Sequence, residues 1–170
     1  MLYAGIGSRS TPPNILSQMF SIAGRLATYN WTLRSGAAKG ADRNFELGMA
    51  FSGHGQKEIY TPSSTDLHWP TLLSHASQFH PNWPACEQMG EYVCKLHARN
   101  SAIILGPNLD QPVDLVICWT PPGHEGGTGQ ALRIARSLSI PIINLRTHMP
   151  SFASVTAIPT AAPIHPLLEV

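Results

Sequence analysis

Charge is scarce in this chain. Only 12% of its 170 residues are charged, about half of the roughly 25% that a globular domain usually carries, and 11 basic against 10 acidic side chains leave a net charge of +1. Non-specific nucleic-acid binding needs many clustered cations, so any anion site here must be local. The 43% hydrophobic content indicates one compact domain, and its largely neutral surface leads us to expect a homodimer.

Long hydrophobic runs and a cysteine framework are also missing. No stretch approaches the roughly 18 uninterrupted apolar residues of a membrane span, and the N-terminus lacks the features of a secretory signal. We therefore expect a cytoplasmic protein with no membrane partner. Cys86, Cys94 and Cys118 form no Cys-x-x-Cys pair and cannot all pair with one another, so reduced thiols are expected.

Short apolar runs alternate with helical periodicity along the chain. The runs typical of buried strands lie at 2–6, 31–34, 58–60, 113–119 and 141–145. Helical spacing follows at about 12–30, 41–49, 85–104 and 130–138, whereas 63–84 has no clean period and is expected to be irregular with one short helix. This order predicts an α/β fold, a Rossmann-like parallel sheet with helices on both faces. The single domain spans 1–146, and a Pro-rich C-terminal tail follows at 147–170.

Three glycine loops follow predicted strands, at Gly7-Ser8-Arg9, 35–42 and 120–129. In an open parallel sheet these loops share the carboxyl edge, so they should converge on one crevice. Glycines let backbone amides approach a ligand, and helix N-termini add partial positive charge, which suits phosphate. Arg9 and Lys39 could neutralise the phosphate, hydroxyls of the loops could donate to it, and Trp119 could stack on a base.

No loop alone identifies the ligand. Gly5-Ile6-Gly7 lacks the full G-x-G-x-x-G dinucleotide fingerprint, and the chain contains no G-x-x-x-x-G-K-[ST] P-loop. Both absences argue against a dinucleotide oxidoreductase and a P-loop ATPase.

Four motifs occur in a telling order: Gly7-Ser8-Arg9, Ser35-Gly36-x-Ala38-x-Gly40-x-Asp42, Leu96-His97-Ala98-Arg99-Asn100 and Gly126-Gly127-Thr128-Gly129. Together they resemble the superfamily that joins the LOG-type (lysine-decarboxylase-like) nucleotide hydrolases with DNA-processing protein A. The resemblance covers about residues 2–146 and extends to phage and bacterial members described only as Rossmann-like nucleotide binders. It implies a Rossmann-like domain, often dimeric, that binds a nucleotide or nucleotide-derived small molecule at the loop edge.

The LOG-type enzymes release the base from a nucleoside 5′-monophosphate, and Arg99 matches an Arg of their site. The positions of the family's glutamates hold Leu132 and Arg133 here, and Asn100 replaces a Lys. This departure favours a sensor or sequestering protein over a hydrolase, while the matching Arg99 keeps hydrolysis open.

N-glycosidic cleavage needs a carboxylate to stabilise the developing oxocarbenium ion or to activate water. Glu125 beside the third loop is the first substitute for the missing glutamate and Asp42 the second, whereas Asp114 begins a strand and should point away from the crevice. The catalytic candidates are Arg99, Glu125 and Asp42. The ligand-binding candidates are Gly7, Ser8, Arg9, Ser35, Gly36, Lys39, Gly40, Asn100, Trp119, Thr120, Gly126, Gly127, Thr128, Gly129 and Gln130.

Two further possibilities receive less support from the sequence. DNA-processing protein A binds single-stranded DNA, but this nearly neutral chain has no run of basic residues interleaved with aromatics. The segment 68–97 is rich in ligand-type side chains, namely His68, His75, His80, Cys86, Cys94 and His97. Because their spacing matches no usual zinc pattern, we expect neither a metal nor another cofactor.

Overall fold

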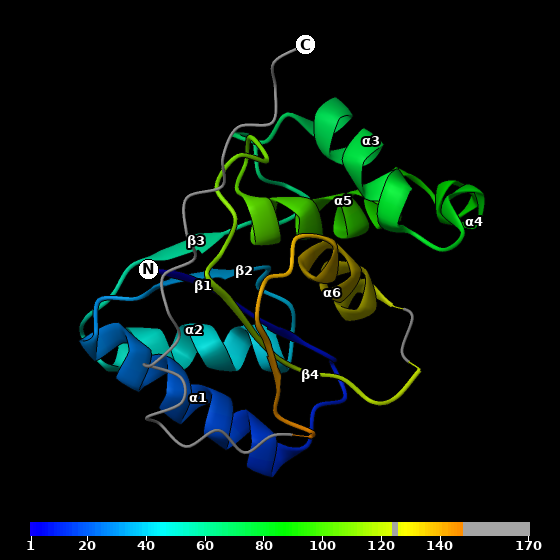
Figure 1. Ribbon diagram of the computed structural model, residues 1–170. Coiled ribbons are helices and arrows are strands. Elements are labelled where there is room, and N and C mark those ends of the chain that lie inside the picture. Colours follow the sequence, from blue (N-terminus) through cyan, green and yellow to red (C-terminus); the bar gives the residue numbers. More distant parts are fainter. Residues whose placement is uncertain (124–125, 148–170) are drawn as a thin grey trace.

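A computed structural model describes residues 1–123 and 126–147 of the chain. Its centre is a parallel five-stranded sheet in the order β3-β2-β1-β4-β5 (Figure 1). The strands are β1 (Leu2–Gly7), β2 (Thr32–Ser35), β3 (Lys57–Ile59), β4 (Leu115–Trp119) and β5 (Ile142–Asn144). The predicted α/β class and the Rossmann-like parallel sheet are confirmed.

Helices cover both faces of the sheet. They are α1 (Pro13–Thr28), α2 (Ala41–Phe51), α3 (Trp69–Phe79), α4 (Trp83–Gln88), α5 (Glu91–Leu105) and α6 (Gly127–Ser137). Figure 1 shows α1 and α2 together on one face and α3 to α6 on the other. This two-sided cover explains why the strands are apolar on both faces, as strands of a parallel sheet usually are.

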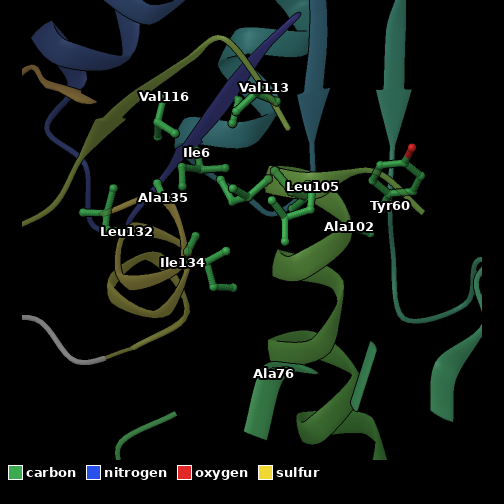
Figure 2. Close-up of a cluster of buried hydrophobic side chains, with 14 of the residues drawn as sticks. Ile6, Tyr60, Ala76, Ala102, Leu105, Val113, Val116, Leu132, Ile134 and Ala135 are labelled. Carbon is green, nitrogen blue, oxygen red and sulfur yellow. The ribbon is translucent and has the colours of Figure 1, made fainter. Parts of the chain in front are cut away.

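Alternate strand residues supply the two hydrophobic cores, because successive side chains of a strand point to opposite faces. Tyr3 and Leu33 face α1 and α2, where they join Met19 and Phe45 in one buried cluster. Ile6 and Val116 face the other way and pack with residues of α5 and α6 (Figure 2). The two cores anchor the strands whose ends form the loop edge.

The segment 63–84 is more regular than predicted, because it contains α3 and the start of α4. The prolines of this segment favoured the prediction of irregular structure. Pro70 and Pro84 lie in the first turns of helices, however, where a residue without an amide hydrogen breaks no hydrogen bond of the helix. The predicted helix 85–104 is two helices, α4 and α5. The chain changes direction between them at Gly90, which has a φ of 98°, and α5 begins at the next residue, Glu91.

The third glycine loop is shorter than predicted, because α6 already begins at Gly127. Gly127, Thr128 and Gly129 are therefore the first turn of a helix rather than loop residues. Glu125 and residues 148–170 of the predicted tail lie outside the described residues.

Candidate functional site

The topological switch point of the sheet lies between β1 and β4. From β1 the chain passes to β2 and β3 on one side and returns to β4 and β5 on the other. The register pairs Gly7 with Trp119, so β1 and β4 end side by side. Parallel sheets bind ligands outside the carboxyl ends of the strands at this point, which is where the sequence places the crevice.

The first two glycine loops touch backbone to backbone. A Cβ on Gly7 would lie 2.6 Å from the Cβ of Ala41, and one on Gly40 would lie 3.2 Å from the carbonyl oxygens of Ser8 and Arg9. Gly40 also has a φ of 88°, which a larger residue rarely adopts. Small residues are therefore required here for close packing of the two loops.

Two of the hydroxyls predicted to hold phosphate are used within the protein. Ser8 Oγ lies 2.8 Å from Ser10 Oγ, and Ser35 Oγ donates to the carbonyl oxygen of Gly5 at 2.6 Å. Thr11 Oγ1 donates to the carbonyl oxygen of Ser8 at 2.6 Å and tightens the turn after β1. Thr128 is buried in the first turn of α6. In this conformation the hydroxyls of Ser8 and Ser35 shape the loops.

A buried ion pair joins the second loop to α5. Arg99 Nη2 lies 3.9 Å from Asp42 Oδ2, and the two residues are only 8% and 4% exposed. The guanidinium of Arg99 also donates to the carbonyl oxygen of Gly36 and, at 3.4 Å, to that of Tyr60. Asp42 accepts a hydrogen bond from the amide of Ala38 at 3.3 Å. Two catalytic candidates thus meet each other, and their contacts hold the loop.

The same surroundings shift the pKa of both groups. Burial raises the pKa of Asp42 to about 6, although the Arg99 charge and the amides of Ala38, Gly7 and Gly36 lower it. Burial likewise lowers the pKa of Arg99, against the charge of Asp42. The carboxyl therefore titrates close to neutral pH, in the range where a carboxyl can exchange a proton during catalysis.

A second buried network fastens the start of α6 to α5. Asn100 Nδ2 donates to the carbonyl oxygen of Gly127 at 3.1 Å and contacts Gln130 Oε1 at 3.4 Å. Gln130 is fully buried, and its Nε2 donates to the carbonyl oxygen of Ala76 at 3.1 Å. Arg99 and Asn100 are neighbours on a helix and point about 100° apart, so α5 reaches the second glycine loop and the start of α6 from adjacent positions.

The sequence analysis did not place His97 at this edge. His97 Nδ1 lies 2.6 Å from Gln130 Oε1 and so belongs to the network that holds α6. The available signal was its position two residues before Arg99, on a helix whose last four residues are apolar. Asp114 points away from the crevice as predicted, since its Oδ2 accepts from the amide of Leu2 at the opposite edge, at 2.8 Å.

Positive charge without a partner remains on the first two loops. Arg9 and Lys39 are exposed, and neither forms an ion pair in the described part of the chain. The cap residues of α2 and α6 are Gly40 and Gly126, which have no side chain that could bond the first-turn amides. The amide of Arg43 in the first turn of α2 donates to the carbonyl oxygen of Ala38 at 3.1 Å, so a phosphate there would be bound by the other amides at the start of the helix.

Trp119 and Thr120 stand at the end of β4, on the far side of the first loop. Trp119 is half-buried. Its backbone carbonyl oxygen accepts a hydrogen bond from the amide of Ser8 at 3.1 Å. Thr120 is buried, and its carbonyl oxygen is contacted by Asn144 Nδ2 at 3.5 Å. The Trp119 ring is thus the aromatic surface closest in sequence to the glycine loops.

A hollow of about 490 Å³ lies away from these loops, between α3, α4 and α5. Its lining includes Leu73, Trp83 and Glu91 and none of the glycine-loop residues. Because phosphate recognition depends on backbone amides and cations, we place the candidate site at the loop edge rather than in this hollow.

Solved structures resemble the chain in architecture. DNA-processing protein A from Helicobacter pylori, described for its single-stranded DNA binding mode, superposes with a TM-score of 0.56 at 20% identity, over 84% of this chain and 63% of that one. The likeness shows a Rossmann-like fold. The chain thus spans less than two thirds of that protein. The molybdenum cofactor carrier protein of Chlamydomonas reinhardtii gives a TM-score of 0.49 at 17% identity, over 83% of this chain and 73% of that one.

Sequence comparison adds no relative to these structures. No family model matches the chain, and no curated protein matches it. Among the described residues, no helix is both long and apolar enough to cross a membrane.

Proposed function

We propose that this Rossmann-like domain binds a nucleotide or nucleotide-derived small molecule at the carboxyl edge of its sheet and acts as a sensor or sequestering protein. The observation that carries the proposal is the close contact of two glycine loops that also bear two exposed cations, Arg9 and Lys39, which form no ion pair within residues 1–123 and 126–147. The starts of α2 and α6, each with a glycine as the cap residue, add backbone amides. Such a site favours a phosphate group bound by backbone amides and a few charges.

The rest of the ligand would extend from the phosphate toward β4. The half-buried ring of Trp119 offers a face for a base, since aromatic stacking suits every base. We propose residues 1–146 as the binding unit, acting in the cytoplasm as a homodimer. Sedimentation velocity tests the dimer, which is rejected if the protein stays monomeric at the concentrations used for binding.

Calorimetric titration with nucleoside mono-, di- and triphosphates, NAD and cyclic nucleotides tests the binding role. Arg9→Ala and Lys39→Ala should each weaken the best ligand about tenfold, because each removes a charge-assisted phosphate contact. The control is Arg136→Ala, which removes another exposed cation, in the last turn of α6 and far from the start of that helix. If all three variants bound the ligand as tightly as the wild type does, the ligand site would lie elsewhere.

Hydrolysis of an N-glycosidic bond is the second candidate, and the raised pKa of Asp42, about 6, favours it. Arg99 would orient the phosphate, and Asp42 or Glu125 would supply the carboxylate. Mass spectrometry after incubation with each nucleotide tests this candidate through free base and sugar phosphate. Loss of product in Asp42→Asn or Glu125→Gln with binding intact would support catalysis, and no product from the wild type would leave only binding.

Single-stranded DNA is the ligand named for the Helicobacter pylori neighbour. The net charge of +1 argues against the same role here, because strand binding gains much of its affinity from phosphate neutralisation. An oligonucleotide titration at two salt concentrations separates the cases. Tight binding that falls steeply with salt, without binding of mononucleotides, would replace the nucleotide proposal.

A further inference from the structure

Four side chains that can bind a metal meet where α3, α4 and α5 come together. His80 directly follows α3, Cys86 lies in α4, and Cys94 and His97 lie three positions apart in α5. Ligand atoms of His80, Cys86 and His97 all lie within 4.8 Å of one another. Cys94 lies outside this group of three, but its Sγ is 3.3 Å from Cys86 Sγ, so it can supply a fourth ligand.

The separations are close to those of a tetrahedral metal site. With bonds of about 2.0–2.3 Å to nitrogen and sulfur, tetrahedral ligands stand about 3.4–3.8 Å apart. Separations of up to 4.8 Å between His80, Cys86 and His97 therefore need to shorten by about 1.4 Å at most. The rings of His80 and His97 already touch edge to face, with centroids 4.5 Å apart.

Hydrogen bonds prepare His97 as a ligand. Gln130 Nε2 donates to the carbonyl oxygen of Ala76, so its Oε1 is the acceptor that lies 2.6 Å from His97 Nδ1. His97 Nδ1 must then carry the proton, and Nε2 keeps its lone pair for a metal. Metal-binding histidines usually donate their other nitrogen to an oxygen in this way, which fixes the ring.

Burial and charge also suit a metal with thiolate ligands. Cys86 and Cys94 are 2% and 5% exposed and are not disulfide-bonded to each other. A divalent ion held by two thiolates and two neutral imidazoles has no net charge, which lowers the cost of its burial. Arg133 Nε donates to the carbonyl oxygen of Phe79, which directly precedes His80.

We propose that His80, Cys86, Cys94 and His97 form a structural Zn²⁺ site. Zinc prefers such a mixed nitrogen and sulfur set in tetrahedral geometry, whereas Mg²⁺ and Ca²⁺ require oxygen ligands. Binding forms two S–Zn and two N–Zn bonds and releases the two thiol protons to solvent, with no change of oxidation state. His80 turns its ring or moves its proton to Nδ1, giving up the 3.2 Å hydrogen bond from the Asn82 amide.

Such a site would fasten α3 and α4 onto α5. Through His97 and Gln130 it would also steady the start of α6, and so the third glycine loop. The zinc site is independent of the ligand proposed above, since it uses none of the residues assigned to phosphate.

Metal analysis of the full-length protein tests the site. Protein purified with reductant and dialysed against Zn²⁺ and then against metal-free buffer should retain one zinc per chain. Cys86→Ser, Cys94→Ser and His97→Ala should each reduce the retained zinc at least tenfold, whereas Cys118→Ala and His68→Ala, matched changes outside the cluster, should retain it. Gln130→Leu should weaken zinc binding by about tenfold to a hundredfold through His97.

Cobalt provides a readout that does not depend on the stability of variants. Wild-type protein loaded with Co²⁺ should show thiolate-to-cobalt charge transfer and the visible bands of a tetrahedral site. The proposal is overturned if the wild type retains less than a tenth of an equivalent of zinc and shows no thiolate band. It also fails if Cys118→Ala rather than Cys86→Ser removes the metal, or if Cys86 and Cys94 form a disulfide and no metal binds in reductant.

Discussion

Removing the guanidinium of Arg99 should make the stability of the protein depend on pH in a new way. Arg99→Met keeps most of the apolar stem but leaves Asp42 buried without its cation. In the wild type the pKa of Asp42 is about 6 in the folded protein and 3.8 for the free group. The protonated carboxyl therefore contributes fully to the free energy of unfolding below pH 3.8, and this contribution is lost as the pH rises through 6. At about 1.4 kcal/mol for each pH unit, this loss amounts to about 3 kcal/mol and ends near pH 6.

The magnitude for the variant follows from the distance between the two charges. Two charges 3.9 Å apart attract by about 4 kcal/mol at an effective dielectric constant of about 20. Without that attraction the pKa of Asp42 rises above neutrality, and the variant continues to lose about 1.4 kcal/mol per pH unit beyond pH 6. By pH 8 the charged Asp42 of the variant has lowered the free energy of unfolding by about 3 kcal/mol more than in the wild type. The variant also loses about 1–3 kcal/mol at every pH, because the hydrogen bonds from Arg99 to the carbonyl oxygens of Gly36 and Tyr60 are gone.

Urea unfolding of both proteins at pH 5 and pH 8 measures this effect. The difference in unfolding free energy between wild type and Arg99→Met should be larger at pH 8 by about 3 kcal/mol, and other titrating groups cancel because both proteins share them. When Asp42→Asn is present in both proteins, Arg99→Met should lower the unfolding free energy by the same amount at pH 5 and at pH 8. An equal difference at both pH values, within about 0.5 kcal/mol, would refute the coupling of Arg99 to a titrating Asp42.

Three further outcomes follow from the packing and hydrogen bonds. Gly48→Ala should destabilise the protein by about 1–3 kcal/mol or more in thermal unfolding, because its Cβ would overlap the carbonyl oxygen of Phe20 where α1 crosses α2. Gln130→Met should lower the free energy of unfolding by about 2–4 kcal/mol, because it leaves the hydrogen-bonding groups of His97, Asn100 and Ala76 buried without their partner. An unchanged urea midpoint would contradict the importance of these hydrogen bonds. Burial lowers the pKa of His75, whose Nδ1 lies 2.9 Å from Ser101 Oγ, so its contribution to stability is full above its unfolded pKa and declines as the solution is acidified. A His75→Gln variant should show a shallower loss of stability between about pH 7 and pH 5 in urea unfolding, and an unaltered slope would exclude His75 as a source.

The candidate site was only partly accessible to sequence reasoning. The convergence of three strand ends followed from the alternating pattern, because parallel strands share their carboxyl edge. The pairing of Arg99 with Asp42 and of Asn100 with Gln130 did not follow from it, since each pair joins segments far apart in the chain. Those contacts depend on how α5 turns against the sheet.

The zinc proposal illustrates the same limit. The spacing of His80, Cys86, Cys94 and His97 matches no usual zinc pattern, so the sequence favours a site without metal. Spacing rules assume that ligands lie on one or two short elements, whereas here one ligand follows α3, one lies in α4 and two lie in the first turns of α5.

The sequence by itself determined the class of fold, the order of its main elements and the edge at which its loops meet. Hydrophobic periodicity and glycine placement are local properties, and each element expresses them within its own few turns. Tertiary structure alone decided which polar groups are buried together, which hydroxyls are already used, and where helix α6 begins. Those outcomes arise from contacts between distant segments, whose desolvation and hydrogen bonding exist only once both cores have closed around the sheet.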